Sequence, residues 1–155
     1  MSESAPTPRL VTRAPQDCAV VRETVPMAQL TEFFSRAFGA TMAAATAQGR
    51  HIVGPPFGIY FGMPTDTVDV AAGFPVDAPI EAADAVTPYQ LPGGEAVELL
   101  HLGPYDAMGE SYDRLLAWMG KHHLTAAQVM WESYLNEPQS HHPEATQTLI
   151  TWPVV

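Results

Sequence analysis

Two tyrosines and one glutamate in this sequence have the spacing of a ligand-binding or acid–base site. Glu132 and Tyr134 lie two residues apart, and alternate side chains of a β-strand lie on the same face. An earlier segment matches this one, because Tyr60 precedes Pro64 by four residues, as Tyr134 precedes Pro138. A carboxylate among phenol rings attracts cations, and it also accepts a proton from water when it acts as a general base.

These two segments indicate a unit that the chain uses twice. Where the first copy has Gly58, the second has Glu132, so a symmetric scaffold carries one asymmetric carboxylate. On the strand face of Tyr60, Gly58 and Gly62 have no side chains. We therefore expect open volume beside the glutamate and the tyrosines.

The first unit, residues 9–76, is predicted to have the order strand, helix, strand, strand. Its extended segments are expected at residues 9–13, 18–25, 56–63 and 68–76. Pro26 is predicted as the first helical residue. The apolar stripe of the helix has the three-and-four spacing of a helix face and consists of Leu30, Phe33, Phe34, Ala37 and Phe38. The pattern leaves open whether this helix breaks near Gly39 or continues to Gly49.

After a connection at residues 77–86, residues 87–155 repeat the same order. Pro104 takes the place of Pro26, and strands are expected at residues 89–91, 96–102, 129–135 and 145–152. The second helix stripe consists of Tyr105, Met108, Tyr112, Leu115, Leu116 and Met119. We predict one α+β domain over residues 9–155, with a curved antiparallel sheet, two main helices and a central cleft, after a loose tail at residues 1–8.

Composition limits the classes of function. A chain of 155 residues with 46% apolar content is long enough for one domain with a substantial core. Its formal charge of −10 argues against direct binding to nucleic acid. The single Cys18 forms no internal disulfide, and no apolar segment has the length of a signal peptide core or a membrane span. We therefore expect a cytoplasmic protein that has no contact with a membrane.

Three segments resemble the GyrI-like small-molecule-binding domain family, which also forms the effector-binding half of multidrug-responsive transcription activators. They are residues 101–105, 111–119 and 132–138. The resemblance spans nearly the whole chain and implies a duplicated βαββ fold, similar to SOUL and SHS2 domains, with the ligand between the halves. No helix-turn-helix segment precedes Arg9, so the resemblance is to a stand-alone version.

Carried over position by position, the resemblance places the pocket carboxylate of the family on Glu132. It places aromatic wall positions on Tyr60, Tyr105 and Tyr134. Tyr112 is a further ligand-binding candidate, and its place on the helix stripe also fits a core residue. Tyr60 and Tyr134 have a plainer interpretation as well, in which they close the core and leave their hydroxyls at the surface.

The resemblance implies binding of bulky, flat, hydrophobic and often cationic compounds around a buried Glu132, for sequestration or antibiotic resistance. An alternative is a cofactor-independent hydrolase that opens strained cyclopropane rings, with Glu132 as the catalytic base and Tyr134 or Tyr60 assisting. A third hypothesis is an acidic surface that docks a protein partner such as gyrase. No cofactor is expected.

Two plainer interpretations concern charged and metal-binding residues. Glu132 has the alternative role of a strand-edge residue that pairs with Arg114 or Lys121. The six histidines include the adjacent pairs 122–123 and 141–142, whose side chains face different ways and therefore seldom chelate one ion. We predict solvated loop histidines and no metal site.

Overall fold

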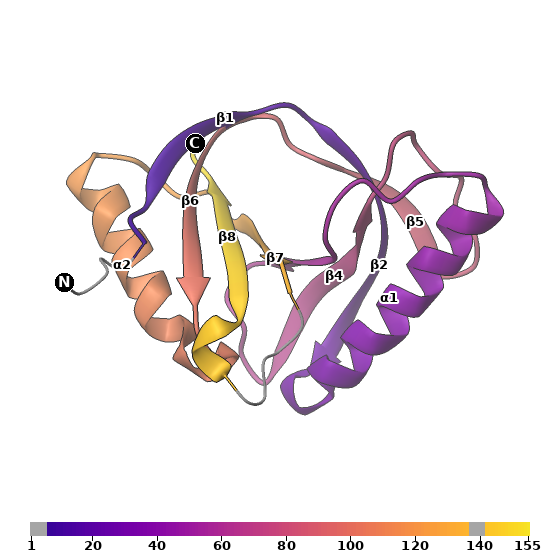
Figure 1. Cartoon of the computed structure of the whole chain (residues 1–155), viewed down its shortest axis with the longest axis horizontal. Coiled ribbons are helices and arrows are strands. Elements are labelled where there is room, and N and C mark those ends of the chain that lie inside the picture. The colour runs from indigo at the N-terminus through magenta and orange to yellow at the C-terminus, as the bar shows by residue number, and fades with distance from the viewer. Residues whose placement is uncertain (1–5, 137–141) are drawn as a thin grey trace.

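The computed structural model describes residues 6–136 and 142–155, and Figure 1 shows a curved sheet flanked by two helices. Its strands are β1 (Arg9–Arg13), β2 (Gln16–Pro26), β3 (Phe57–Phe61), β4 (Thr67–Pro75), β5 (Val86–Leu91), β6 (Gly94–Leu102), β7 (Val129–Tyr134) and β8 (Gln147–Pro153). Its helices are α1 (Leu30–Ala47) and α2 (Met108–Lys121), with 3₁₀ turns η1 (Met27–Gln29), η2 (Tyr105–Ala107) and η3 (Pro143–Ala145). The predicted α+β class is confirmed.

All eight strands form one antiparallel sheet in the order β1-β6-β8-β7-β3-β4-β2-β5. The two halves join where β3 pairs with β7, and Gly58 lies directly opposite Glu132 in this pair. These are the two positions that the repeat makes equivalent. The local two-fold axis therefore passes between them, and the asymmetric carboxylate is beside it.

The first strand of each half is added to the sheet of the other half. β1 pairs with β6, and β5 pairs with β2. Side chains also tie β1 to β6, because Arg9 and Arg13 contact the two carboxylate oxygens of Glu98 at 3.4 and 3.2 Å. The two halves are consequently interlocked through their outer strands as well as through the central pair.

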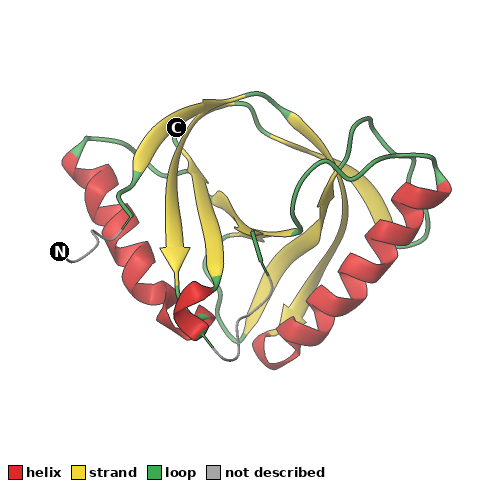
Figure 2. Cartoon of the chain, in the orientation of Figure 1, coloured by secondary structure: helices red, strands yellow, loops and turns green. Residues whose placement is uncertain are grey.

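Both helices pack on one face of the sheet, at opposite ends (Figures 1 and 2). The buried residues of α1 are Phe33, Ala37, Thr41 and Ala45, and those of α2 are Met108, Ser111, Leu115 and Met119. Tyr60 of β3 packs against the clusters under both helices. The opposite face has its own apolar cluster around Trp131 and Phe57, with the Arg13 guanidinium 5.6 Å from the Trp131 ring.

The helices begin differently from the sequence prediction. Pro26 and Pro104 are not the first helical residues; both have extended backbone, with ψ of 141° and 158°. The proline ring fixes φ at a value that extended and helical backbone share, so φ alone does not decide the state. A 3₁₀ turn follows each proline, and only then does the α-helix start.

Two further details of the helices complete or correct the sequence prediction. α1 continues unbroken past Gly39 to Ala47. Leu116 does not belong to the buried stripe of α2, because it is 44% exposed. Successive helical residues lie about 100° apart, and the neighbouring Leu115 already occupies the face toward the sheet.

The N-terminal segment is described only from residue 6 onward. Pro8 is buried, and the Arg114 side chain donates a hydrogen bond to the carbonyl of Pro6. Within residues 6–136 and 142–155, neither helix has the length and apolar content needed to cross a membrane.

Candidate functional site

A cavity of about 830 Å³ opens between α1 and the start of α2, at the junction of β3 and β7. From α1 it is lined by Leu30, Thr31, Phe34 and Phe38, and from η2 and α2 by Tyr105 and Met108. The sheet contributes Tyr60, Glu132 and Tyr134, and the adjoining connections contribute Pro55, Pro56, Leu135 and Asn136. The wall is mostly apolar and aromatic, with one carboxylate.

Glu132 is partly buried on the helix-facing side of β7, and phenols occupy both of its carboxylate oxygens. The Tyr134 hydroxyl donates a hydrogen bond to Oε1 at 3.0 Å, and the Tyr112 hydroxyl donates one to Oε2. Among the ion pairs of the described residues, none involves Glu132. The strand β7 lies inside the sheet and not at its edge. The alternative in which Glu132 is a strand-edge residue paired with Arg114 or Lys121 is therefore wrong.

Burial and neighbouring charge decide the protonation of this cluster. Burial raises the pKa of Glu132 above its usual value, and the hydrogen bonds from Tyr112 and Tyr134 partly offset that effect. Burial and the negative charge of Glu132 raise the pKa of Tyr60 and Tyr112 as well. The phenols therefore stay protonated at neutral pH and act as hydrogen-bond donors.

Tyr134 is the centre of an aromatic wall. Its ring makes edge-to-face contacts with Phe34 and Tyr105, both at 5.9 Å between ring centroids, and with Phe38 at 6.5 Å. Burial and the neighbouring Tyr60 both contribute to the raised pKa of the Tyr134 hydroxyl. Such a wall offers several ring faces and edges to a flat or cationic ligand.

The two glycines do not leave open volume in the way that the sequence suggested. A Cβ atom on Gly58 would lie 2.8 Å from the Phe34 ring and 3.1 Å from the Tyr134 hydroxyl, so the missing side chain makes room for these two residues. Gly62 lies outside the cavity lining and follows β3 with a φ of 119°. The cavity lies instead between α1 and the start of α2, whose residues line it.

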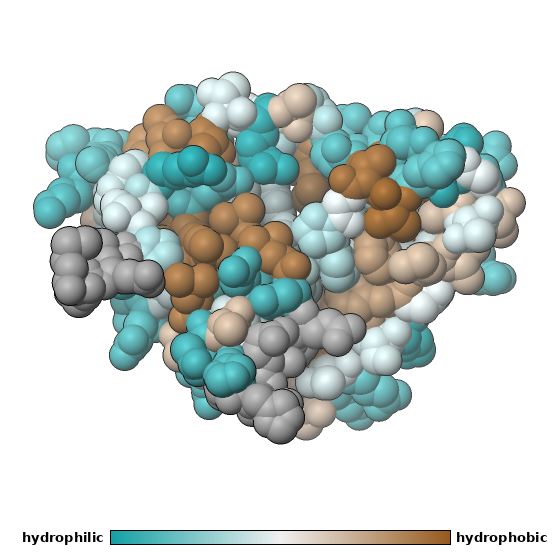
Figure 3. All heavy atoms as spheres, viewed as in Figure 1, coloured by the Kyte–Doolittle hydropathy of each residue, from teal (hydrophilic) through white to brown (hydrophobic). Residues whose placement is uncertain are grey.

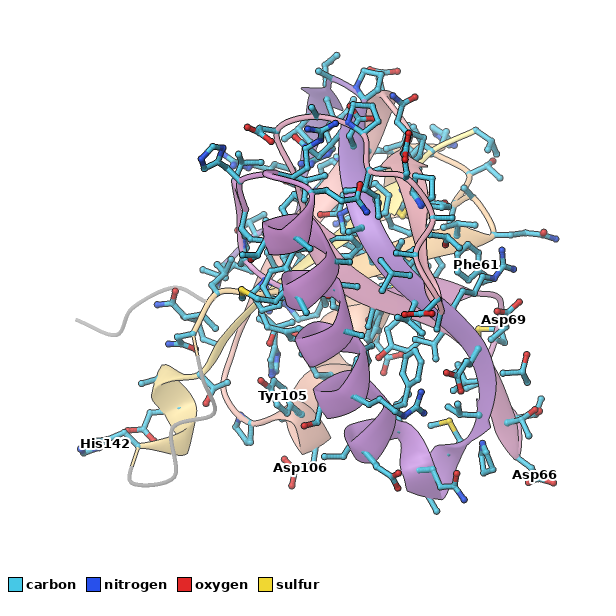
Figure 4. The ribbon with its side chains drawn as sticks, turned by 90° about the vertical axis from the view of Figure 1, so that its right-hand side faces the viewer. Phe61, Asp66, Asp69, Tyr105, Asp106 and His142 are labelled. Carbon is cyan, nitrogen blue, oxygen red and sulfur yellow. The ribbon has the colours of Figure 1, made fainter. Side chains whose placement is uncertain are left out.

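The structure brings together all five residues that the sequence suggested. Glu132, Tyr60, Tyr105 and Tyr134 line the cavity, and Tyr112 reaches Glu132 as a hydrogen-bond donor without lining it. Tyr105 is 44% exposed. In the view of Figure 4, the labels of Tyr105 and Phe61 appear on opposite sides of the α1 ribbon.

Sequence reasoning missed the contribution of α1. Phe34 and Phe38 belong to the predicted core stripe, but both line the cavity, while Phe33 and Ala37 are the buried residues. The signal was present in the sequence as two adjacent apolar rows on one helix, a wider stripe than packing on one sheet requires.

The histidines form no metal site in the described part of the chain, where no group of three or more His, Cys, Asp or Glu could hold an ion. His141 lies outside the described residues. The expectation of solvated loop histidines is wrong for His101, which is a strand residue of β6 with only 3% exposure.

Nearly the whole sequence matches one known protein family. The family model of the GyrI-like small molecule binding domain matches residues 6–155. The chain belongs to this family. No curated protein sequence matches it at a significant level.

Solved structures share the fold of this GyrI-like domain at low sequence identity. The EcmrR C-terminal domain is 19% identical with a TM-score of 0.83, and the match covers 97% of this chain and 98% of that one. The EcmrR chain in a solved EcmrR–DNA complex is 18% identical to this chain, with a TM-score of 0.82. It covers 96% of this chain and 57% of the EcmrR chain, so the chain spans little more than half of that protein.

Two other solved structures share this fold. The structure of SAV2435 bound to tetraphenylphosphonium is 14% identical with a TM-score of 0.66, covering 96% of this chain and 93% of that one. A hydrolase from Listeria innocua is 14% identical with a TM-score of 0.69, covering 99% and 94%. At these identities the likeness is one of fold.

Proposed function

We propose that this GyrI-like domain binds bulky hydrophobic cations, with the positive charge beside Glu132 and the apolar body against the aromatic wall. The observation that carries the proposal is one carboxylate, held by two phenols, on the wall of an otherwise mostly apolar cavity of about 830 Å³. Desolvating this carboxylate costs free energy, which raises its pKa. A bound cation offsets that cost.

The aromatic residues favour the same class of ligand. Each tyrosine ring that faces a desolvated cation contributes about 0.5–2 kcal/mol of cation–π attraction. Phe34 and Phe38 of α1 add apolar surface to the same aromatic wall, since both rings contact Tyr134. The tetraphenylphosphonium bound by SAV2435, a protein of the same fold, is a hydrophobic cation of this kind. Tight binding without turnover lowers the free concentration of a toxic compound, so sequestration is the role we propose.

Isothermal titration calorimetry with tetraphenylphosphonium tests the proposal, with triphenylphosphine oxide as a neutral probe of related shape. We expect the cation to bind and Glu132→Gln to weaken its binding by about tenfold to a hundredfold, or ~1.4–2.8 kcal/mol. The neutral probe should lose little affinity in the same variant, because it gains nothing from the charge.

The matched control is Glu95→Gln, which removes an exposed carboxylate from β6 outside the cavity. It should leave both affinities unchanged. If Glu95→Gln and Glu132→Gln lose the same affinity for the cation, the cause is the net charge of the protein and not the site. An absence of binding for both probes in the unaltered protein would overturn the proposal.

A second candidate function is hydrolysis of strained cyclopropane electrophiles. The observation in its favour is a carboxyl group of raised pKa beside phenol donors in a partly enclosed cavity. Glu132 would take a proton from water while the water oxygen bonds to a ring carbon. The strained C–C bond breaks, its electron pair moves into a conjugated carbonyl, and Tyr134 supplies the proton, for net addition of one water. A hydrolase from Listeria innocua has this fold.

Mass spectrometry distinguishes this candidate from binding alone. The probe is a conjugated ketone that carries a spiro-cyclopropane, incubated with the protein in ¹⁸O-labelled water. A hydrolase yields a ring-opened product that contains one ¹⁸O atom, and Glu132→Gln should abolish it while the fold is retained by circular dichroism. Binding of the probe without product rejects hydrolysis for this class of compound.

A further inference from the structure

His101 is a buried polar residue that the proposed function does not use. It is 3% exposed near the end of β6 and faces α2. Its Nε2 lies 2.9 Å from the carbonyl oxygen of Pro104, and its Nδ1 lies 2.7 Å from the hydroxyl of Ser111. Both ring nitrogens therefore have a partner within the chain.

The partners fix the tautomer of the imidazole. A carbonyl oxygen only accepts, so Nε2 carries the proton and donates it to Pro104. In the neutral ring Nδ1 then accepts the proton of the Ser111 hydroxyl. With both nitrogens engaged, the ring connects two segments of the chain.

The two segments are the turn after β6 and the first turns of α2. Gly103 reverses the chain with a φ of 128°, and its N–H donates to the carbonyl of Thr146 at 2.8 Å. Pro104 follows, and Tyr105 is the next residue, the first of η2. His101 thus anchors the backbone directly before Tyr105, and Ser111 anchors the helix behind it.

The same histidine is linked to the cavity wall through the sheet. His101, Thr148 and Tyr134 form a row of cross-strand neighbours over β6, β8 and β7. Tyr134 is in turn the ring against which Tyr105 packs, at 5.9 Å between centroids. The spacing between these two rings on the cavity wall therefore depends on how the turn is fixed to the strand.

We propose that His101 is a positioning residue for ligand binding: with Ser111 and the Pro104 carbonyl, it fixes the turn that places Tyr105 on the cavity wall. The effect on binding rests on the proposed function. The first half has no such arrangement, because the residue three positions before Pro26 is Glu23, which pairs with Arg36 of α1 at 2.6 Å. The positioning device belongs to the half that carries the carboxylate.

The position of Tyr105 is measurable without any ligand. In protein labelled with 3-fluorotyrosine, Tyr105→Phe assigns the ¹⁹F resonance of Tyr105 among the five tyrosines. We expect this resonance to shift or broaden in Ser111→Ala and in His101→Leu, while that of Tyr89, on the opposite sheet face, stays in place. Ser111→Ala is the variant expected to keep the fold, because alanine has a higher helix propensity than serine. The control Glu23→Gln should leave Tyr105 unmoved.

The consequence for binding follows from a double-mutant cycle with tetraphenylphosphonium. We expect Ser111→Ala to weaken binding about two- to tenfold, as the loss of one ordinary hydrogen bond does. In a Tyr105→Ala background the same substitution should have no further effect, because its target is gone. His101→Gln, whose amide both donates and accepts, should restore part of the affinity lost in His101→Leu.

The outcomes separate this inference from the proposed function. An unmoved Tyr105 resonance, or an equal loss of affinity in both Tyr105 backgrounds, overturns the role of His101 even when Glu132→Gln weakens binding as proposed. If tetraphenylphosphonium does not bind at all, the proposed function fails. The fluorine spectra alone then decide whether His101 positions Tyr105.

Discussion

At the scale of single residues, the surroundings of Glu132 disfavour its charged form in the unliganded protein. Burial raises its pKa, and the two phenol hydrogen bonds offset only part of that effect. The folded protein therefore holds this proton at pH values where the unfolded chain has released it. Stability that depends on Glu132 is complete below the usual glutamate pKa of 4.5 and is lost as pH rises through the raised value.

A first prediction follows for the stability of Glu132→Gln. The variant cannot ionise at this position, so its free energy of unfolding relative to the unaltered protein should increase with pH and reach a plateau above the raised pKa. Urea unfolding between pH 4 and pH 8, followed by circular dichroism, measures this difference. A difference that stays constant over this range would contradict the raised pKa.

A second prediction concerns ligand affinity at the same residue. A cation prefers the ionised carboxylate, so the affinity for tetraphenylphosphonium should rise with pH through the raised pKa of Glu132 and then level off. Calorimetry across the pH range measures it, and the slope should vanish in Glu132→Gln. The groups that also face this carboxylate are Tyr60, Tyr105, Tyr112, Tyr134 and His101.

At the scale of elements, the contact between α1 and the central strands depends on a missing side chain. Phe34 and Tyr134 fill the space where Gly58 would carry a Cβ atom. We predict that Gly58→Ala destabilises the protein by about 1–3 kcal/mol, since it overpacks an aromatic contact. The same change should weaken ligand binding, because it displaces two residues of the cavity wall. Denaturant unfolding and calorimetry measure the two effects.

The control for this prediction lies in α1 itself. Gly39 is a helix-interior residue, and no atom lies within 4 Å of the position that a Cβ atom would take there, so Gly39→Ala meets no clash. It should stabilise the protein by about 0.5–1 kcal/mol through lower backbone entropy in the unfolded chain. Equal effects of the two substitutions would show that Gly58 has no special packing role.

At the scale of the whole molecule, the exchange of outer strands joins the halves. β1 completes the sheet of the second half, and β5 completes that of the first half. A half without the borrowed strand leaves an edge of β2 or β6 unpaired, so neither half is expected to be stable alone. This arrangement also holds the two helices at a fixed separation, from which the cavity arises.

A further prediction is that the halves unfold in one transition. Trp118, Trp131 and Trp152 all lie in the second half, so their fluorescence reports on that half, whereas circular dichroism reports on both. The two signals should give the same denaturant midpoint and slope. A fluorescence transition that is separate from the circular dichroism transition would show independent halves.

The hypothesis that an acidic surface docks a protein partner stays a prediction. The formal charge is −10, and Figure 3 shows apolar side chains gathered on one face among hydrophilic ones. The excess of acidic residues fits either solubility or a basic protein partner. Binding to such a partner should weaken as salt is raised, which pull-down at low and high ionic strength would measure.

Local patterns in the sequence determined the elements and the identity of the chemical groups. Helical spacing indicated both helices, alternation and turn residues indicated most strand positions within a few residues, and the Gly58 to Glu132 difference pointed to the carboxylate. The resemblance to GyrI-like domains correctly indicated the family. The helices and strands depend on neighbours in the chain, so a short window predicts them, whereas the carboxylate and the family were found by comparing segments along the whole sequence.

Only the tertiary structure decided how these groups meet. The placement of Glu132 opposite Gly58, the use of Phe34 and Phe38 as cavity wall, and the burial of His101 all depend on strand pairing and helix packing across the chain. A wide apolar stripe looks the same in sequence whether it packs on a sheet or borders a cavity. What distinguishes the two is the distance between α1 and α2, which is set by contacts far apart in sequence.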